Sequence, residues 1–428
     1  MKSMTKSFKT SINSLSITSL AAAILMAGSS VAMAQTIAIT NATLHTATEQ
    51  GTLQNATVVI KDGVISAINP SAVDAQKVID AKGQDLTPGF IAPMTAIGLV
   101  EVGAVSQSRD NSDEKADITF DPSLAFNPDS TVIPYTRKGG ITSTVITPAN
   151  AKSIFRGLNS HMDLSGELEH SEIETGVGVY AALGSASKGS RALKMQKLIK
   201  ELDERVQKVA AAKSKKDDKK DAKPPSAKEK ILDALLSGEK VLTVYANRAS
   251  DLLQLIKIKE KFNLNMVLVG SADAPKVAKQ LAAANISVIM SPIANLPRSF
   301  DGRHASLNDA KTLIDAGVNV LFIEREVHNI YQLRFLAGIA IANGVKREDA
   351  LKAVSANVAK AYGLDAGTIA VGKRADLVLW QGDMFDVSGA VDKIWIEGKA
   401  YSTESRQDKL RERYRNKTQK VMPPAYTK

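Results

Sequence analysis

The chain shows two kinds of hydrophobic pattern, and the first kind occupies both ends. Between residues 36 and 87, apolar and polar residues alternate in short runs separated by turn residues, a pattern typical of half-buried β-strands. Asp62-Gly63 lies between two such runs and indicates a two-residue hairpin turn. The same alternation returns at 375–380 and 390–401. We therefore predict a small β-sandwich domain that both termini build together.

The middle of the chain has the second pattern, in which short unbroken apolar runs are followed by helix-like stretches such as 249–262 and 273–284. Unbroken apolar strands that alternate with helices indicate a parallel sheet covered on both faces. Residues 88–366 supply 279 positions, enough for the roughly 250 that an eight-unit barrel needs. The predicted fold class is α/β, a (β/α)8 TIM-like barrel. The apolar runs expected to form its strands are 143–148, 177–183, 241–246, 265–270, 286–292 and 319–324.

The N-terminus has the features of a secretory signal peptide. Three lysines lie among the first nine residues, an apolar stretch follows from about residue 15 to 26, and the small residues Ala32 and Ala34 end it. We expect cleavage after Ala34 and export, which in a bacterium with two membranes means the periplasm. No later segment has about 20 uninterrupted apolar residues, so we predict no transmembrane helix.

These patterns divide the chain into five parts. The predicted parts are a signal peptide (1–34), the first part of the β-sandwich (35–87), the barrel (88–366), the second part of the β-sandwich (367–402) and a basic tail (403–428). Within the barrel, residues 213–230 have dense mixed charge, a Pro-Pro pair and no apolar periodicity, so we expect a solvated insertion between helices. The tail is expected to begin as a helix, and its many Arg and Lys residues make it a docking candidate, although a frayed terminus is the simpler interpretation.

Composition and charge limit the possible binding partners and exclude cysteine chemistry. The chain has no cysteine, so neither disulfides nor thiolate catalysis can occur. Its formal charge of +10 falls to +7 once the three leader lysines are removed. In an exported protein such a charge favours anionic lipid, lipopolysaccharide or an acidic partner over nucleic acid, and ordinary solubility charge is the simplest explanation.

Two segments carry recognisable signatures. Residues 88–98 read PGFIAPMTAIG, close to the pattern PGxIDxHxH, and residues 350–364, ALKAVSANVAKAYGL, run into GTIAVGKRADLVLW. Both segments resemble the amidohydrolase superfamily, and more narrowly its imidazolonepropionase-like and prolidase-like members, over about residues 36–402. The resemblance implies hydrolysis of non-peptide or dipeptide-like C–N amide bonds by a water that one or two divalent metals, commonly zinc, activate.

The residues at the implied metal positions are not ligands. The family has a His-x-His after strand one, often a carboxylated lysine on strand four, histidines on strands five and six, and an aspartate after strand eight. In this chain Ala92 takes the place of the signature Asp. Tyr180 falls where related members have the lysine. The six former ligand positions are occupied by Met94, Ala96, Tyr245, Asn247, Val269 and Arg325.

Thioether, methyl and isopropyl groups do not replace the imidazole and carboxylate donors that hold Zn²⁺. The five histidines of the chain include no His-x-His or His-x-x-x-His pair, and each is expected to be a surface or hydrogen-bonded core residue. The Arg325 guanidinium stays charged, so it would repel a divalent cation and could substitute for its charge. We therefore predict no metal cofactor.

Candidates for a remaining function are few. Arg325, Tyr180, Tyr245, Asn247 and Glu101 are the polar candidates near the former site, although Arg325 could instead be a structural ion pair with Glu101, Glu324 or Glu326, and the tyrosines could simply fill vacated space. The loops 109–117 and 123–130 follow strand one on the expected catalytic face, where barrels of this type carry function.

Three hypotheses follow. The first is an exported pseudoenzyme that serves as a binding or assembly subunit, beside an intact amidohydrolase paralogue or by self-association. The second is a hydrolase of C–N bonds with a non-standard or metal-free site. The third is a binding protein that holds a small anionic ligand through Arg325.

Overall fold

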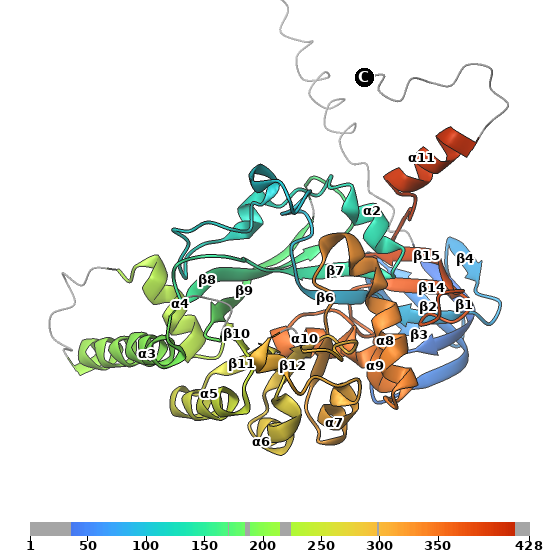
Figure 1. Ribbon diagram of the computed structural model, residues 1–428. Coiled ribbons are helices and arrows are strands. Elements are labelled where there is room, and N and C mark those ends of the chain that lie inside the picture. The colour runs from blue at the N-terminus through green and yellow to red at the C-terminus, as the bar shows by residue number, and fades with distance from the viewer. Residues whose placement is uncertain (1–35, 170, 185–188, 215–223, 298, 416–428) are drawn as a thin grey trace, which may run out of the picture. The chain divides into compact units, whose positions relative to one another are not determined.

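An eight-stranded sheet curls into a nearly closed barrel in the computed structural model of this protein (Figure 1). The structure describes residues 36–169, 171–184, 189–214, 224–297 and 299–415. The two end strands of the sheet, β13 and β6, contact each other. The strands of the barrel are β6 (Phe90–Thr95), β7 (Ile141–Ile146), β8 (Phe155–Asp163), β9 (Glu172–Ala182), β10 (Val241–Ala246), β11 (Asn265–Gly270), β12 (Ser287–Met290) and β13 (Val320–Phe322).

One strand of the barrel runs against the others. β8 pairs antiparallel with both β7 and β9, whereas the sequence predicted only parallel strands and none at 155–163. The sequence did not predict β8 because this strand is polar, although almost all of it is buried. Its His161 ring lies 2.9 Å from the Ser143 hydroxyl, and the Asn159 amide donates to the Thr147 hydroxyl at 3.0 Å. Buried polar residues that form hydrogen bonds with one another leave no apolar run for a pattern to detect.

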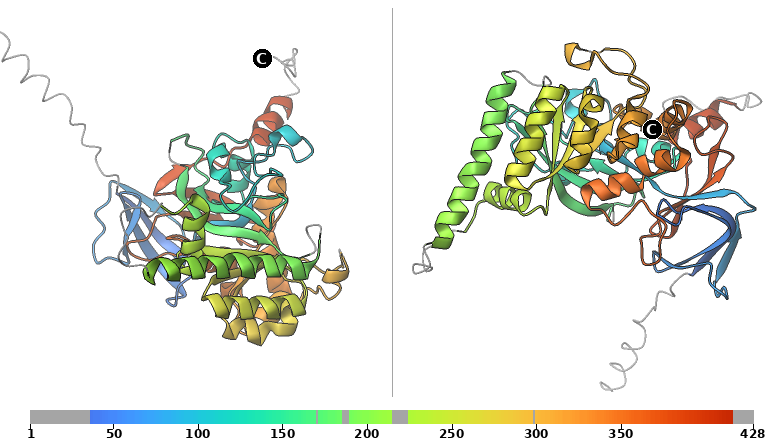
Figure 2. Two further views of the ribbon diagram at one scale, coloured as in Figure 1. Left: turned by 90° about the vertical axis from the view of Figure 1, so that its left-hand side faces the viewer. Right: turned by 90° about the horizontal axis from the view of Figure 1, so that it is seen from below.

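Helices cover the outside of β10 to β13 (Figure 2). Helix α5 covers the predicted range 249–262, whereas the predicted helix 273–284 is a 3-10 turn, η3, followed by α6. The α-helices are α2 (Val132–Arg137), α3 (Arg191–Ser214), α4 (Ala227–Leu236), α5 (Ala249–Phe262), α6 (Ala278–Ala283), α7 (Asp309–Asp315), α8 (Leu333–Ala342), α9 (Arg347–Ala353), α10 (Ala356–Tyr362) and α11 (Arg406–Arg415). The 3-10 helices are η1 (Ser106–Ser108), η2 (Pro122–Ala125), η3 (Ala274–Val277), η4 (Phe300–Gly302) and η5 (Val327–Gln332).

The small sheet takes strands from both ends of the chain, and this, together with the barrel, confirms the predicted fold class. β5 pairs antiparallel with β14 and thereby joins the two ends. Asp62 and Gly63 have φ values of 51° and 77°, as the predicted hairpin turn between β2 and β3 requires. The strands are β1 (Ile37–His45), β2 (Thr52–Lys61), β3 (Val64–Ile68), β4 (Lys77–Asp80), β5 (Asp85–Pro88), β14 (Leu377–Gln381), β15 (Ala390–Ile396) and β16 (Lys399–Tyr401). They surround an apolar core of their own.

The charged segment 213–230 and the basic tail are described only in part. Helix α3 ends at residue 214 and α4 begins at 227, so both ends of the segment predicted as an insertion belong to helices. The Ser226 hydroxyl accepts from the Glu229 amide and forms a capping box that starts α4. The tail begins with the expected helix, α11. The Asp408 carboxylate of this helix forms an ion pair with the Lys138 ammonium at 2.5 Å. Ala34 and the leader lie outside the described residues, and no helix within the described ranges could span a membrane.

Candidate functional site at the barrel mouth

The carboxyl ends of β10, β11, β12 and β13 surround a pocket of ≈ 280 Å³. Three of the residues expected at the former metal site line it, namely Tyr245, Asn247 and Arg325. The remaining wall comes from the segments 291–296 and 299–305 after β12, from Glu324 and Glu326 beside Arg325, and from Gly270, Ala272 and Ile323. The structure therefore brings the polar candidates of strands five and eight together at one opening.

Two glycines hold Tyr245 and Asn247 in place. The Asn247 amide donates to the Tyr245 hydroxyl at 3.0 Å. A Cβ on Gly270 would lie 2.7 Å from Asn247 Oδ1 and 2.9 Å from the Tyr245 ring, and one on Gly184 would lie 3.2 Å from the other side of that ring. Since Gly270 also has a φ of +89°, a side chain at this position would be strained and would collide with the ring. The ring orientation is therefore fixed by close backbone approach on both sides.

The floor beneath the mouth is apolar. Met94 and Val269, which occupy two positions where the resemblance implies histidines, are only 8% and 3% exposed and belong to one cluster that fills the inside of the barrel. Other members of this cluster come from six further elements, and Tyr180 and Tyr245 pack against it. Ala96 packs instead against a separate cluster with Leu99 and Ile146. Side chains from several strands thus pack together around two of the positions at which the resemblance implies metal ligands.

The donors at this place do not fit a divalent metal ion. A thioether within an apolar cluster and the methyl groups of Val269 and Ala96 offer no oxygen or imidazole nitrogen. Among the residues that the structure describes, no group of three or more His, Asp or Glu side chains converges in a way that could hold an ion. We therefore derive no chemistry through a metal at this site.

Positive charge gathers around Tyr180. Burial raises the pKa of Tyr180 to about 12, although the charges of Arg325 and Arg156 act in the opposite direction. Arg156 is only 4% exposed, and burial lowers its pKa. Its guanidinium donates to the Ala151 carbonyl, and within the described ranges it makes no ion pair with a carboxylate. A buried guanidinium without a counter-ion is costly, which makes the neighbourhood attractive to an anion.

Arg325 is also without a carboxylate partner. No Asp or Glu oxygen of the described chain lies within 4.0 Å of its guanidinium, so the alternative of an ion pair with Glu101, Glu324 or Glu326 is wrong for this arrangement. Glu324 accepts instead from the backbone amides of Arg325 and Glu326, at 2.9 and 3.0 Å. Glu101 is exposed, accepts from the Asn127 amide at 3.3 Å and does not line the pocket.

Three histidines have ordinary polar partners. His161 is 1% exposed and contacts Ser143, His45 lies 2.9 Å from Asp85, and His304 lies 2.8 Å from Asp273. His328 is exposed, and His170 lies outside the described residues. The interpretation of these histidines as surface or hydrogen-bonded residues therefore holds wherever the structure describes them.

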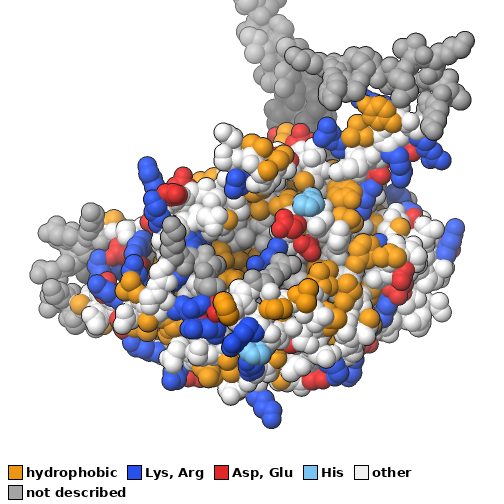
Figure 3. All heavy atoms as spheres, in the orientation of Figure 1, with side chains coloured by type: hydrophobic (Ala, Val, Ile, Leu, Met, Phe, Trp, Pro, Cys, Tyr) orange, Lys and Arg blue, Asp and Glu red, His pale blue; other side chains and the backbone are white. Residues whose placement is uncertain are grey.

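The sequence did not predict one feature near the site and one part of its wall. Arg156 lies on β8, which was not predicted as a strand. The pocket wall comes from the segment after β12, which stands out from the barrel (Figure 2), rather than from the predicted loops 109–117 and 123–130. This segment exposes two large apolar side chains, Leu296 at 77% and Phe300 at 89%, and the face in Figure 3 shows hydrophobic side chains between groups of charged ones.

The chain matches one protein family and shares its fold with solved structures. Residues 131–401 match the model of the amidohydrolase family. An amidohydrolase from Thermotoga maritima has a similar structure, with a TM-score of 0.77, 25% identity, and coverage of 85% of this chain and 99% of that one. A prolidase solved with N-methylphosphonate-L-proline shares the fold at a TM-score of 0.53 and 14% identity, over 86% of this chain and all of that one.

A curated relative has a similar sequence over a shorter stretch. Amidohydrolase tasK of Hapsidospora irregularis is 29% identical over 168 residues, which amounts to 32% of this chain. The chain spans 17% of the length of that relative.

Proposed function

Since the chain belongs to the amidohydrolase family, we propose that it is an exported member that has lost metal-dependent hydrolysis and binds a small anionic molecule at the barrel mouth. The observation that carries this proposal is the contrast between the apolar interior of the barrel and the polar lining of the pocket at its mouth. Met94 and Val269 pack into the apolar interior, whereas Tyr245, Asn247 and Arg325 still line an open pocket. A fold can keep its binding site after its chemistry has gone.

The anionic character of the ligand rests on charge. Arg325 lines the pocket, Arg156 lies near Tyr180, and neither guanidinium has a carboxylate partner within the described residues. Guanidinium groups bind carboxylates and phosphates through paired, charge-assisted hydrogen bonds. The Asn247 amide and the Tyr245 hydroxyl add neutral hydrogen-bonding groups that can orient such a ligand.

Residual hydrolysis without a metal has less support. A general base works best when its pKa is close to the working pH, and the pKa of Tyr180 is raised to about 12. The Glu324 carboxylate already accepts two backbone amides. Export rests on the leader sequence up to Ala34.

A first experiment separates binding from hydrolysis. The protein is purified without chelator, its metal content is measured, and imidazolone and amide substrates are assayed with and without chelator. We expect less than 0.1 metal ion per chain and no turnover. Stoichiometric zinc would overturn the proposal, and chelator-resistant turnover would establish the metal-free hydrolase instead.

A second experiment tests the anion. Thermal unfolding is measured against a series of small carboxylates and phosphates, with matched neutral amides as controls. We expect at least one anion to raise the melting temperature, and Arg325→Gln to abolish that shift. Arg303→Gln is the control, because Arg303 is exposed on the same segment and does not line the pocket. If no anion stabilises the protein, or if both variants behave alike, the anion site is wrong.

The exposed Leu296 and Phe300 favour a second role, association with another protein at the same mouth, and an intact amidohydrolase paralogue is the expected partner. Large apolar side chains that stand in solvent beside a pocket often mark an interaction surface. Affinity purification from envelope extracts should recover a protein with a His-x-His motif, and a Leu296→Ser, Phe300→Ser double variant should lose it. Recovery of the unmodified chain as a monomer without this paralogue would refute the association.

A further inference from the structure

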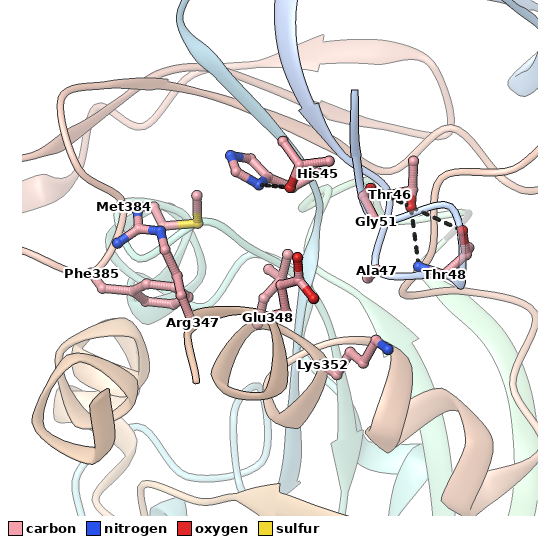
Figure 4. Close-up of a pocket in the computed structure, with 12 residues that line it drawn as sticks. His45, Thr46, Ala47, Thr48, Gly51, Arg347, Glu348, Lys352, Met384 and Phe385 are labelled. Atoms are coloured by element: carbon pink, nitrogen blue, oxygen red, sulfur yellow. Dashed lines mark hydrogen bonds between the residues drawn. The ribbon is translucent and has the colours of Figure 1, made fainter. Parts of the chain in front are cut away.

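A second pocket, of ≈ 170 Å³, lies on the side of the molecule where the β1–β2 loop meets helix α9 (Figure 4). Its walls are the loop 45–52, the α9 residues 347–352, and Met384 with Phe385 after β14. None of the residues of the barrel mouth takes part in it. Whatever it binds is therefore independent of the function proposed above.

The inner surface of this second pocket is apolar. Ala47, Leu351, Met384 and Phe385 are each less than 10% exposed, and in Figure 4 Met384 and Phe385 lie side by side next to Arg347. Since a water molecule takes up about 30 Å³ of liquid, the cavity has room for an apolar body of roughly five or six non-hydrogen atoms. An apolar interior of this size favours a short hydrocarbon or a small ring.

Most charges on the rim already have partners. Arg347 makes a two-pronged ion pair with Asp383, at 2.9 and 2.7 Å, and lies 5.1 Å over the Phe385 ring. His45 lies 2.9 Å from Asp85. Lys352 lies 3.9 Å from Glu49. These groups are committed to the protein and leave little charge for a ligand.

Glu348 is the exception. Within the described residues its carboxylate has neither a hydrogen bond nor an ion pair, and in Figure 4 it points from α9 into the space below the loop. Its Oε1 lies 4.0 Å from the position of a Cβ on Gly51, so it faces the loop across the pocket. Of the charged residues that line the pocket, Arg347 and Lys352 have carboxylate partners outside the lining, whereas Glu348 has no partner of opposite charge within the described residues.

We propose that this second pocket binds a small amphiphilic cation, with its ammonium or guanidinium group on Glu348 and its short apolar part on Leu351, Met384 and Phe385. The unpaired charge of the lining is the Glu348 carboxylate, which favours a cation over an anion, and the apolar floor selects against inorganic cations. Because Glu348 stands at a solvent-exposed rim, a seven-atom ligand should bind with a dissociation constant on the order of 1 mM.

The test uses three probes of equal length, n-hexylammonium, hexanol and hexanoate, in ligand-observed NMR titrations of the whole mature protein. We expect saturable binding of n-hexylammonium, binding of hexanol at least about fivefold weaker, and no binding of hexanoate. Glu348→Gln keeps the shape of the side chain and removes its charge, and it should weaken n-hexylammonium at least about tenfold, since a charge-assisted contact is lost.

Glu49→Gln is the matched control, because Glu49 is fully exposed on the opposite loop and does not line the pocket. It should change the affinity less than twofold, and Arg325→Gln should have no effect. Circular dichroism establishes that each variant is folded. The proposal is overturned if n-hexylammonium does not saturate, if hexanoate binds as well as it does, or if Glu348→Gln binds like the unmodified protein.

Discussion

The buried His161 makes the stability of the barrel depend on pH in a calculable way. The ring is 1% exposed and contacts Ser143 at 2.9 Å. Burial, and next the charge of Arg374, lowers the pKa of His161 from 6.5 to about 3. The unfolded chain therefore takes up a proton more readily than the folded one. The stability that neutral His161 provides is fully present above pH 6.5 and is lost progressively as the pH falls towards 3.

The magnitude follows from the two pKa values. At pH 5.5, one unit below the unfolded pKa, the free energy of unfolding should be about 1.4 kcal/mol lower than at high pH, whereas at pH 7.5 the loss is only about 0.1 kcal/mol. Urea unfolding, followed by far-ultraviolet circular dichroism at both pH values, measures the difference. His161→Gln keeps an amide close to Ser143 and removes the titration, so about 1.3 kcal/mol of the pH dependence should disappear.

His328→Gln is the control for this experiment, because His328 is exposed and its replacement should leave the pH dependence unchanged. Every carboxylate is the same in His161→Gln and in the unmodified protein, so the difference between the two isolates the titration of His161. If His161→Gln loses as much stability between pH 7.5 and 5.5 as the unmodified protein, the reasoning about His161 is refuted.

Three further changes test the packing described above. Val269→His places an imidazole without a partner in the apolar interior and should lower the free energy of unfolding by about 2–4 kcal/mol in urea titrations; full recovery on addition of zinc would show that a metal site persists. Gly270→Ala forces a Cβ against Asn247 and Tyr245 and should lower the free energy of unfolding by about 2–4 kcal/mol. The control Gly83→Ala, with a φ of +80° and no neighbour within 4 Å, should lower it by only about 1 kcal/mol through backbone strain. Equal losses of stability in the two variants would argue against the collision. Ser226→Ala removes the capping box of α4 and should cost about 1 kcal/mol, and an unchanged urea midpoint would contradict the role of the cap.

Hydrophobic periodicity was sufficient wherever strands and helices have unbroken or amphipathic faces. The runs 241–246 and 265–270 coincide with β10 and β11, and 249–262 coincides with α5. It failed at β8, because Asn159 and His161 are buried through hydrogen bonds rather than through apolar surface. Burial of that kind depends on partners such as Ser143, which are distant along the chain.

The site could be predicted only in part for a similar reason. The resemblance identified Tyr245, Asn247 and Arg325, and these converge on the pocket. Whether Arg325 pairs with a carboxylate depends on side-chain direction, which no sequence pattern encodes. Arg156 was missed together with its strand, and Glu348 was missed because one unpaired acid among several paired charges has no signature in the sequence.

The pairing of β5 with β14 has a consequence for how the chain matures. β5 ends at residue 88 and its partner starts at 377, so the N-terminal strands keep one unpaired edge until the chain has been made beyond residue 377. An unpaired edge is a template for wrong strand pairing, and the long interval lengthens the time during which it is exposed. A chain truncated before residue 377 should therefore aggregate through this edge even though it contains every strand of the barrel, because β14 is the strand that covers it.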